Sequence, residues 1–579
     1  MSTALEKQYQ KKTDKEHILD NPDTYIGSVE NIDTTSYIFD ENSKIFTNKA
    51  FYYIPGLYKL FDEAIVNCRD HSIRIKQAMD DCKANTLPMS YIHIEIDSTT
   101  GTITMTNDGN GIDVAKHPTY DIWIPEMIFG HLRTGTNYDK SEKKIVGGKN
   151  GFGSKLIFIW STFGSIETVD HTRRLKYSQS FKNNLDEICP PVIKKFTGKP
   201  YTKISFRPDY ARLQKEGLTA DEIALFKKRV YDIAAVTDKS VKVKYNGDLV
   251  PIKDFQQYID LYIGNKTDNK RVYEQSDSRW EYAVALSPSE EFSQVSFVNG
   301  IYTSKGGKHI EYVMNQIVKK LTAYILKKKK VEVKSTTIKE QIMLFLRCDI
   351  ENPAFDSQTK DYMNTPMNKF GSSCIVSDKF IEKIAKMGVM DSACALTEVK
   401  QNKTAKKSDG TKSKSIRGIP KLVDANFAGT DNSHKCTIIF CEGDSAKAGI
   451  ISGLSKEDRN LIGVYPMKGK LFNVRGEPIQ KISENKEIIE IKQILGLETD
   501  KVYESLNDIK QHLRYGQILF MTDQDLDGSH IKGLGINMFQ SQWHSIAKLN
   551  IIGFMNTPII KAKKGSTEKV FYNDGEYET

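Results

Sequence analysis

Apolar residues recur along the chain with the periods of both helices and strands. Residues 57–68 carry large apolar side chains at i, i+3, i+4 and i+7 behind Pro55-Gly56, which predicts an amphipathic helix. Residues 92–96 and 103–105 alternate apolar and polar positions around a turn, which predicts a β-hairpin. Later, 437–441 and 518–521 are continuous apolar runs. Such runs are typical of strands buried on both faces of an α/β sheet.

Changes in composition divide the chain. An extended pattern ends at the turn signal Asn246-Gly247, and a new segment begins near Pro251. Residues 399–415 (VKQNKTAKKSDGTKSKS) nearly lack large apolar side chains, which is typical of a solvated linker. The final FYNDGEYET reads as an interrupted sequence.

Composition narrows the class of protein. At roughly 150 residues per domain, a chain of 579 residues predicts about three to four domains. A hydrophobic content of 39% with a mean hydropathy of −0.47 excludes a disordered or membrane protein. The net charge of +9 permits a polyanionic partner without requiring one. The eight Cys form no C-x-x-C motif, and neither a signal peptide nor a run of 18 apolar residues is present. We therefore expect an intracellular protein that is neither secreted nor membrane-spanning.

Two polar residues share one face of the first predicted helix. Glu63 and Asn67 lie four residues apart. A carboxylate there could accept a proton from an attacking water, and an amide oxygen could ligate Mg²⁺. Alone, the pair also fits a solvated helix edge.

Two glycine-containing segments follow. In Asn107–Ile112 (NDGNGI), the Asp108 carboxylate could accept the exocyclic amine of adenine, although the segment alone also fits a turn. Residues 147–155 (GGKNGFGSK) put four glycines at a helix start, where N–H groups and the helix dipole favour phosphate. The order Gly-Ser-Lys excludes a Walker A loop.

The order E-x-x-x-N, D-x-G-x-G-I and G-x-N-G-x-G-x-K resembles the GHKL-type ATP-binding fold of gyrase, heat-shock-90 chaperones, histidine kinases and mismatch-repair ATPases. The resemblance implies that Glu63 is the general base, Asn67 a Mg²⁺ ligand and Asp108 the adenine acceptor. The implied phosphate-binding residues are Gly148, Lys149, Asn150, Gly151, Phe152, Gly153, Ser154 and Lys155, and Gly135, Thr136 and Asn137 would lie near the nucleotide.

Carboxylates follow both buried strands. Glu442 ends the first, and Asp523, Asp525 and Asp527 alternate after the second, so in an extended segment they would share one side and hold Mg²⁺ with Glu442. An EF-hand is excluded because Leu534 stands where its last Glu would be. Solvated loop acids remain an alternative.

E-G-D-S-A followed by D-x-D-x-D-G resembles the Toprim fold of topoisomerases, primases and some nucleases. The resemblance implies that Glu442 and Asp523 share one Mg²⁺, which stabilises charge on the scissile phosphate and the leaving sugar oxygen. It implies that Asp525 helps hold a second, DNA-anchoring ion, with Asp527 as a further candidate.

The two modules together are similar to eukaryotic-type (type IIA) DNA topoisomerase II over nearly the whole chain. Residues 352–360 (NPAFDSQTK) look like that family's transducer loop, in which Gln358, Thr359 and Lys360 belong to the ATP site and Lys360 touches the γ-phosphate. Tyr9 would cross to the partner's nucleotide. The resemblance implies a homodimer that uses ATP and Mg²⁺.

The resemblance also implies an α+β and α/β multidomain fold. We expect a GHKL-type ATPase α/β sandwich with an N-terminal strap at 1–250 and a ribosomal-S5-like transducer domain at 251–400. A Lys/Ser-rich linker at 401–424 and a Toprim Rossmann-like α/β domain at 425–579, incomplete at its C-terminal end, would follow.

Basic residues are candidates for contact with double-stranded DNA. Residues 466–475 (PMKGKLFNVR) are similar to the family's P-L-R-G-K-x-x-N-V-R, although Lys468 replaces Arg and loses its fork geometry. Near the metals, the resemblance implies DNA contacts from Lys468, Lys470, Arg475, Asn485, Arg514 and His530. Lys327, Lys328, Lys329 and Lys330 match a basic loop facing the captured duplex, although such a run also fits a solvated face.

The nucleophilic Tyr of this family stands well downstream in a winged-helix domain. Tyr515 precedes the metal strand, and Tyr572 and Tyr577 match the Toprim region. We therefore expect a C-terminal breakage-reunion region beyond Thr579, in the same or another polypeptide. The implied function is an ATP-dependent type II DNA topoisomerase, acting in whichever compartment, nuclear, viral or cytoplasmic, holds its DNA. The alternatives are an ATP-driven DNA clamp without cleavage and a Toprim nuclease.

Overall fold

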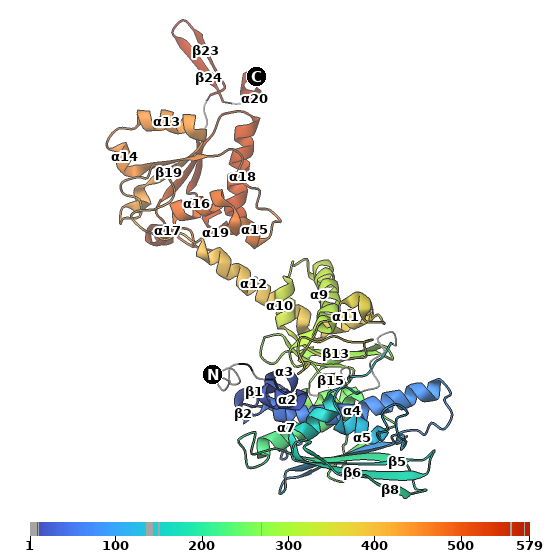
Figure 1. The fold of residues 1–579 in the computed structure, drawn as a ribbon. Coiled ribbons are helices and arrows are strands. Elements are labelled where there is room, and N and C mark those ends of the chain that lie inside the picture. Colours follow the sequence, from blue (N-terminus) through green and yellow to red (C-terminus); the bar gives the residue numbers. More distant parts are fainter. Residues whose placement is uncertain are drawn as a thin grey trace. The chain divides into compact units, whose positions relative to one another are not determined.

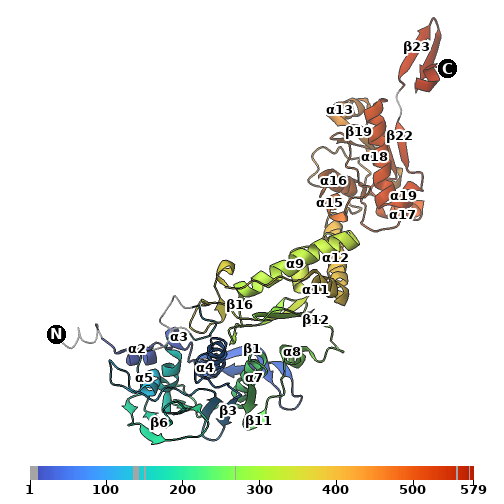
Figure 2. The same ribbon diagram turned by 90° about the vertical axis from the view of Figure 1, so that its right-hand side faces the viewer.

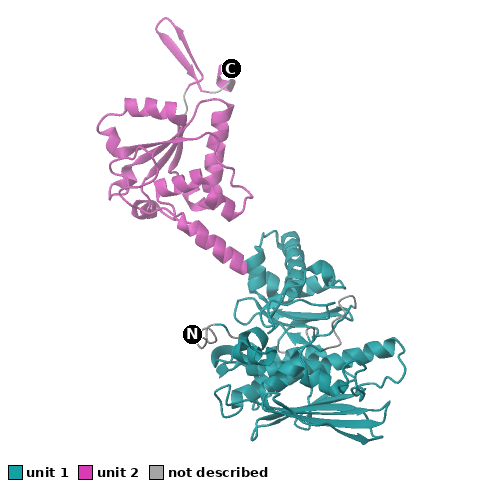
Figure 3. Cartoon of the chain, viewed as in Figure 1, with its two compact units in different colours: residues 1–394 teal, residues 395–579 magenta. Residues whose placement is uncertain are grey.

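The computed structural model describes residues 9, 11–134, 143–148, 151–267, 269–555, 558–572 and 574–578. It contains two compact units, residues 1–394 and 395–579, which are coloured separately in Figure 3. In the described part of the chain, every helix is too short or too polar to cross a membrane.

The first unit contains a nine-stranded sheet with the order β11-β10-β3-β4-β9-β5-β6-β7, and β8 pairs with β6. Helices α4 and α7 lie on one of its faces, as Figure 1 shows, and α6 packs between α4 and the strands β5 and β9. The alternation of buried and exposed residues along β4 puts Ile103, Met105 and Asn107 on the buried side, beneath α4. The strands are β3 (Tyr91–Asp97), β4 (Thr102–Asp108), β5 (Ser161–Asp170), β6 (Leu175–Lys182), β7 (Glu187–Ile188), β8 (Val192–Lys195), β9 (Tyr201–Pro208), β10 (Lys242–Tyr245) and β11 (Asp248–Leu249).

Smaller elements complete this layer. The hairpin of β1 and β2 packs against α7. The elements are α2 (Asp14–Asp20), α3 (Pro22–Tyr25), β1 (Ile32–Phe39), β2 (Phe46–Tyr53), α4 (Pro55–Asp80), α5 (Ile124–Gly130), α6 (Gly153–Ile159), α7 (Ala220–Val236) and α8 (Phe255–Ile263).

The same unit contains a five-stranded sheet with the order β12-β13-β17-β14-β15. Helix α9 packs along it around a separate apolar core, and Figure 2 shows the helix beside the sheet. The elements are β12 (Arg271–Asp277), β13 (Trp280–Leu286), β14 (Ser293–Val298), β15 (Ile301–Tyr302), β16 (Gly306–Gly307), α9 (Lys308–Lys329), α10 (Ser335–Glu340), β17 (Ile342–Cys348), β18 (Tyr362–Met363), η1 (Met367–Lys369), α11 (Asp378–Ile384) and η2 (Ala385–Val389). Helix α12 (Met390–Lys407) begins in this unit and continues into the second.

The second unit is built on a parallel four-stranded sheet with the order β20-β19-β21-β22. Its elements are η3 (Ser433–Lys435), β19 (Thr437–Glu442), α13 (Gly443–Gly453), α14 (Asp458–Leu461), β20 (Ile462–Met467), α15 (Ile479–Glu484), α16 (Lys486–Leu495), α17 (Leu506–His512), β21 (Gln517–Met521), α18 (Leu526–Gln542), α19 (His544–Ala547), β22 (Ile552–Met555), β23 (Ile560–Lys564), β24 (Thr567–Phe571) and α20 (Asp574–Glu578).

The α+β and α/β fold class is confirmed. The predicted helix is α4, the predicted hairpin is β3 and β4, and the two apolar runs are the neighbouring central strands β19 and β21.

The structure differs from a solvated chain in the Lys/Ser-rich segment predicted as a linker at 401–424. The first residues of this segment belong to α12, and the rest pack against the second unit. The Gly410 N–H donates to the Leu497 carbonyl at 2.9 Å, and Arg514 Nε donates to the Ser413 carbonyl at 2.7 Å. Polar contacts rather than apolar side chains hold much of the segment, so its composition resembles that of a linker. The domain boundaries near 250 and 400 stay predictions.

Candidate nucleotide and metal sites

Glu63 on α4 is almost fully buried, with 5% of its surface exposed. Its Oε1 atom accepts a hydrogen bond from Lys360 Nζ at 2.8 Å and lies 2.9 Å from Lys59 Nζ. Lys360 comes from the loop between β17 and β18 and has a φ of 64°, which is uncommon outside glycine. The structure thus brings the predicted transducer lysine onto the predicted general base.

The two lysines control the ionisation of Glu63. Burial alone raises the pKa of this carboxyl, but the charges of Lys360 and Lys59 and their hydrogen bonds outweigh burial and lower the pKa to about 2. Glu63 is therefore a carboxylate at neutral pH, and a weakly basic one while both lysines contact it.

The glycine-rich segment lies against the same helix. Asp70 is fully buried and accepts hydrogen bonds from the N–H groups of Gly147 at 2.9 Å and Gly148 at 2.8 Å. A Cβ on Gly148 would lie 3.8 Å from Asn67 Oδ1, and one on Gly153 would approach Glu63 Oε2 to 2.2 Å. A side chain at position 153 would therefore displace Glu63 Oε2 from its place beside the glycine segment.

Asp70, which anchors the glycine segment, was not among the residues predicted from the sequence. The signal for it was the helical period, because Asp70 stands three residues beyond Asn67. Burial raises its pKa, although Arg74, Arg69 and the two N–H donors act in the opposite direction.

Lys155 supports the glycine segment from inside the protein. Only 1% of the residue is exposed, and its Nζ donates to the carbonyls of Thr134 at 2.6 Å and Gly151 at 2.7 Å. Burial lowers its pKa to about 8. Phe152 caps α6, and Ser154 Oγ donates to the Ile128 carbonyl at 3.2 Å.

The structure describes only some of the remaining predicted ATP-site residues. Gly135, Thr136, Asn137, Lys149 and Asn150 lie outside the described residues. Tyr9 is 73% exposed. Gln358 and Thr359 belong to the Lys360 loop, where Thr359 Oγ1 donates to Asp361 at 3.0 Å.

The expectation that Asp108 is the adenine acceptor needs correction. Its Oδ1 accepts the N–H groups of Ser90 at 2.7 Å and Tyr91 at 2.9 Å, and its Oδ2 accepts the Ser90 hydroxyl. The carboxylate therefore fixes the start of β3. The preceding Asn107 is 6% exposed and lies on the face of β4 beneath α4.

The motif spacing could have identified Asn107. In D-x-G-x-G, the glycines stand two and four positions after the first residue. Gly109 and Gly111 therefore assign that first position to Asn107 rather than to Asp108.

In the second unit, two predicted metal ligands follow neighbouring parallel strands. Glu442 ends β19, and its Oε2 is buried without a hydrogen-bond partner. Asp523 follows β21 and is exposed. These side chains come from the carboxyl ends of adjacent strands, as expected for an α/β ligand site.

The other two carboxylates do not have the expected extended geometry. Asp525 caps α18 by accepting the Gly528 N–H at 2.7 Å, and the helix begins at the next residue. Asp527 therefore lies in the first helical turn, where it pairs with Lys470 at 2.9 Å. Over the described ranges, no three His, Cys, Asp or Glu side chains gather closely enough to hold a metal ion.

The predicted DNA-contacting residues differ in exposure. Lys468, Lys470, Arg475 and His530 are exposed in the second unit. Asn485 caps α16 by accepting the Ile488 N–H at 3.1 Å. In the first unit, Lys327, Lys328, Lys329 and Lys330 are exposed at the end of α9, where the helix dipole favours cations.

Arg514 is the second correction among the site residues. It is fully buried, pairs with Asp424, and donates to the carbonyls of Ser413 at 2.7 Å and Ile494 at 2.9 Å. Its guanidinium is committed to interior acceptors, so it does not line a DNA surface.

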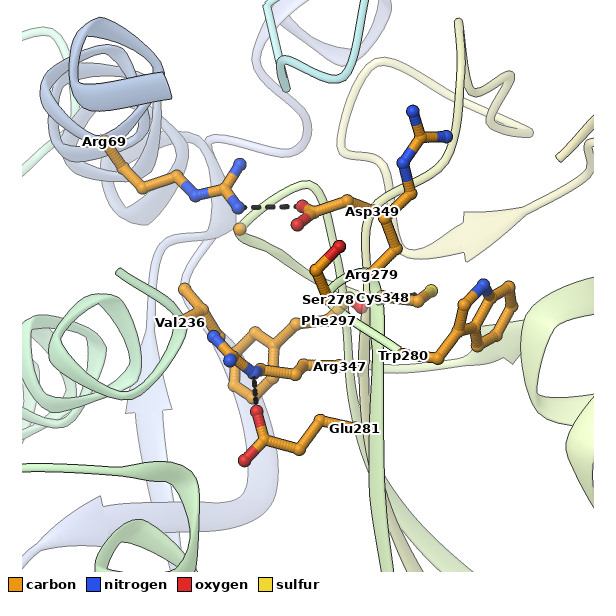
Figure 4. A pocket seen from close by; sticks show the side chains of 11 residues that line it. Arg69, Val236, Ser278, Arg279, Trp280, Glu281, Phe297, Arg347, Cys348 and Asp349 are labelled. Carbon is orange, nitrogen blue, oxygen red and sulfur yellow. Dashed lines mark hydrogen bonds and ion pairs between the residues drawn. The ribbon is translucent and has the colours of Figure 1, made fainter. Parts of the chain in front are cut away.

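A small pocket lies between α4 and the five-stranded sheet (Figure 4). Arg69 Nη2 donates to Asp349 at 2.8 Å across it, and Arg347 pairs with Glu281. These pairs balance the charges of the four side chains. The contact of Arg69 with Asp349 joins α4 to the start of the segment that carries Lys360.

Two protein-family models match this chain, one mainly in the first unit and one in the second. The DNA gyrase B family matches residues 254–414, and the Toprim domain family matches residues 437–552. DNA topoisomerase 2 of Drosophila melanogaster is 42% identical over 99% of this chain, and that of Arabidopsis thaliana is 44% identical over 99%. The chain spans 39% and 38% of the lengths of these relatives.

Solved structures match the first unit. The ATPase region of Saccharomyces cerevisiae topoisomerase II is 39% identical, with a TM-score of 0.63 over 68% of this chain and 99% of that chain. The ATPase and transducer domains of DNA topoisomerase II from Balamuthia mandrillaris are 37% identical, with a TM-score of 0.63 over 68% of this chain and 98% of that one. The matches in sequence and structure show that this chain belongs to the eukaryotic-type DNA topoisomerase II family.

Proposed function

We propose that the chain provides the ATP-hydrolysing and Mg²⁺-binding portion of an ATP-dependent type II DNA topoisomerase. The whole enzyme would pass one duplex through a transient double-strand break and so relax or decatenate DNA. The contact of Lys360 with Glu63 carries the proposal, because it joins a distant loop to the carboxylate of a GHKL-type site.

In this proposal, Glu63 takes a proton from the water that attacks the γ-phosphate of ATP. Asn67 would contribute an oxygen ligand to Mg²⁺, and the glycine segment would bind the phosphates through its N–H groups. Asn107 replaces Asp108 as the residue proposed to face the base. Support comes from the approach of Gly148 to Asn67 and of Gly153 to Glu63.

Lys360 has a second acceptor once ATP is bound. Its ammonium would donate to the γ-phosphate, and that contact would compete with the contact to Glu63 Oε1. If the Lys360 ammonium moved from Oε1 to the γ-phosphate, the pKa of Glu63 would rise from about 2 toward its ordinary value, and the carboxylate would become a stronger base.

In the second unit, we propose that Glu442 and Asp523 hold Mg²⁺ and that Asp525 helps hold a second ion. The unpartnered, buried Oε2 of Glu442 fits a cation ligand. When bound, the metal would stabilise charge on the scissile phosphate. Lys468, Lys470, Arg475 and His530 would contact the DNA backbone.

We further propose that two copies of the chain form a homodimer and that Tyr9 reaches the partner's nucleotide. The nucleophilic Tyr would come from a breakage-reunion region in the same or another polypeptide. The family relationship supports both proposals.

Replacement of Glu63 by Ala tests the ATPase assignment. We expect E63A to lower the rate of phosphate release by roughly 10²- to 10⁴-fold, as loss of a general base does, while ATP binding persists. D80A is the control, because Asp80 is an exposed carboxylate on the same helix. Hydrolysis by E63A at the parental rate would overturn the assignment.

A further inference from the structure

Glu63 has two lysine partners that differ in their freedom to move. Lys59 lies one helical turn before Glu63 on α4, and 4% of its side chain is exposed. It also lies 3.1 Å from Asp62 Oδ2, so two carboxylates of one rigid helix hold its ammonium. Lys360 reaches the same oxygen of Glu63 from a loop.

A buried ionic chain extends behind Lys59. Asp62 Oδ1 accepts a hydrogen bond from Arg229 Nε at 2.7 Å, and Arg229 Nη2 donates to the Gly300 carbonyl at 2.7 Å. Arg229 is fully buried on α7, and Gly300 lies in the turn between β14 and β15. Lys59 is therefore fixed from both sides, by Glu63 and by Asp62.

The two oxygens of the Glu63 carboxylate have different neighbours. Both ammonium groups contact Oε1, whereas Oε2 faces Gly153 in the glycine segment. An oxygen in that position is directed toward the proposed phosphate site. A carboxylate whose other oxygen stays anchored cannot rotate away from this direction.

We infer that Lys59 is a positioning residue for ATP hydrolysis, which stays on Glu63 Oε1 when Lys360 moves to the γ-phosphate and so keeps Oε2 directed at the attacking water. This inference rests on the proposed ATPase function. The proton of the water moves to Oε2 while its oxygen bonds to the γ-phosphorus and the bond to the ADP oxygen breaks.

The charge of Lys59 would also keep Glu63 ionised when ATP is bound. Burial favours the protonated form of Glu63, and triphosphate adds negative charge nearby. If both lysines left Oε1, Glu63 would tend to hold its own proton. Among the described residues, Lys59 and Lys360 form ion pairs with Glu63, and Asp62 and Arg229 lie behind Lys59.

The test compares K59M, K59R and K228M in the 579-residue chain. Lys228 is the control for loss of a buried lysine, because it pairs with Asp232 at 2.9 Å one helical turn away. It joins the same ionic chain only at its far end, where Arg229 Nη1 lies 3.9 Å from Asp232, and it does not contact Glu63. Steady-state hydrolysis of MgATP is measured from about pH 3.5 to 9, so that the acidic limb set by Glu63 falls within the range, and thermal unfolding checks each fold.

We expect K59M to lower kcat by roughly 10- to 100-fold, with a smaller change in KM, because the base is misplaced. The acidic limb of its kcat profile should move to higher pH, because Lys59 no longer favours the carboxylate. K59R keeps the charge and should restore the parental limb and part of kcat. K228M should keep the parental kcat and limb.

Parental kcat and an unmoved acidic limb in folded K59M would overturn the inference. Equal losses of kcat in K59M and K228M, without a shift of the limb, would also overturn it, because they would indicate a general structural effect. E63Q distinguishes a failure of the Lys59 inference from a failure of the proposed ATPase function. If E63Q hydrolyses ATP at the parental rate, the assignment of Glu63 as the general base is wrong.

Discussion

Lys360 and Glu63 are 297 positions apart in the sequence, yet the Lys360 ammonium donates to the Glu63 carboxylate at 2.8 Å. Both groups are buried, so the contact is poorly screened by solvent. A γ-phosphate would compete with Glu63 for the charge and the N–H donors of the same ammonium. The pair is therefore suited to report on the arrival of ATP.

The first prediction concerns the strength of this pair. In a double-mutant cycle of K360M and E63Q, we expect a coupling energy of about 1–3 kcal/mol from urea unfolding of the first unit, as for residues in one buried network. A cycle on the exposed pair Lys44 and Glu41 should give about 0–1 kcal/mol. Equal coupling in the two cycles would contradict the importance of burial.

The second prediction concerns acid stability. The folded pKa of Glu63 is lowered from 4.5 to about 2, so its charge contributes stability above pH 4.5 that is lost as the pH falls toward 2. The parental free energy of unfolding should therefore fall more steeply across that interval than that of E63Q, by about 3 kcal/mol in total. Urea titrations at successive pH values measure the difference.

The matched control for acid stability is E290Q, which changes an exposed Glu. Its curve should follow the parental one. If the unfolding free energies of E63Q and the parental chain fell in parallel with pH, the folded structure would not lower the pKa of Glu63.

The sequence revealed those elements whose signal is local. The period of the apolar residues identified α4, and continuous apolar runs identified β19 and β21. The helical period of α4 also places Glu63 and Asn67 on one face of that helix. Each of these features depends on residues within a few positions of one another.

Long-range polar contacts left no such signal. The ammonium of Lys360 and the guanidinium of Arg514 find their partners through the tertiary fold, so neither burial could be inferred from residue type. Arg514 and Arg475 look alike in sequence, yet one is buried and the other exposed. The alternation of Asp525 and Asp527 predicts that both side chains point to the same side of an extended segment. The structure instead begins helix α18 directly after Asp525, and the sequence pattern does not reveal this helix cap.

The third prediction separates Asn107 from Asp108. We expect N107A to weaken ATP binding, because Asn107 holds the first position of the glycine motif. D108N should bind ATP normally and lower stability by about 1–2 kcal/mol, because it weakens the contacts to Ser90 and Tyr91. Calorimetric titration with ATP and thermal unfolding measure the two effects. Loss of binding in D108N alone would restore Asp108 as the adenine acceptor.

The fourth prediction distinguishes two arginines of the second unit. R514M should lower stability by about 1–3 kcal/mol, because the carbonyls of Ser413 and Ile494 lose their buried donor, whereas Asp424 is partly exposed and keeps its contact with the Tyr515 hydroxyl. R475M should leave stability unchanged but weaken binding to duplex DNA and reduce the salt slope by about 0.9. DNA binding at several salt concentrations and urea unfolding test both variants. An unaltered salt slope in R475M would remove Arg475 from the DNA contacts.

The last prediction concerns the metal site. In a complete enzyme that contains this chain, D523A should abolish Mg²⁺-dependent DNA cleavage while ATP hydrolysis continues, because Asp523 and Glu63 belong to different compact units. E442Q should act in the same way, because it removes the charge beside the unpartnered Oε2. D458N is a suitable control, since Asp458 instead caps a short turn with Ser455.

Cleavage by D523A at the parental rate would exclude Asp523 as a required ligand, and loss of both activities would indicate misfolding. Because the four carboxylates do not form one preformed cluster, cleavage should also depend more weakly on Asp527, which already pairs with Lys470.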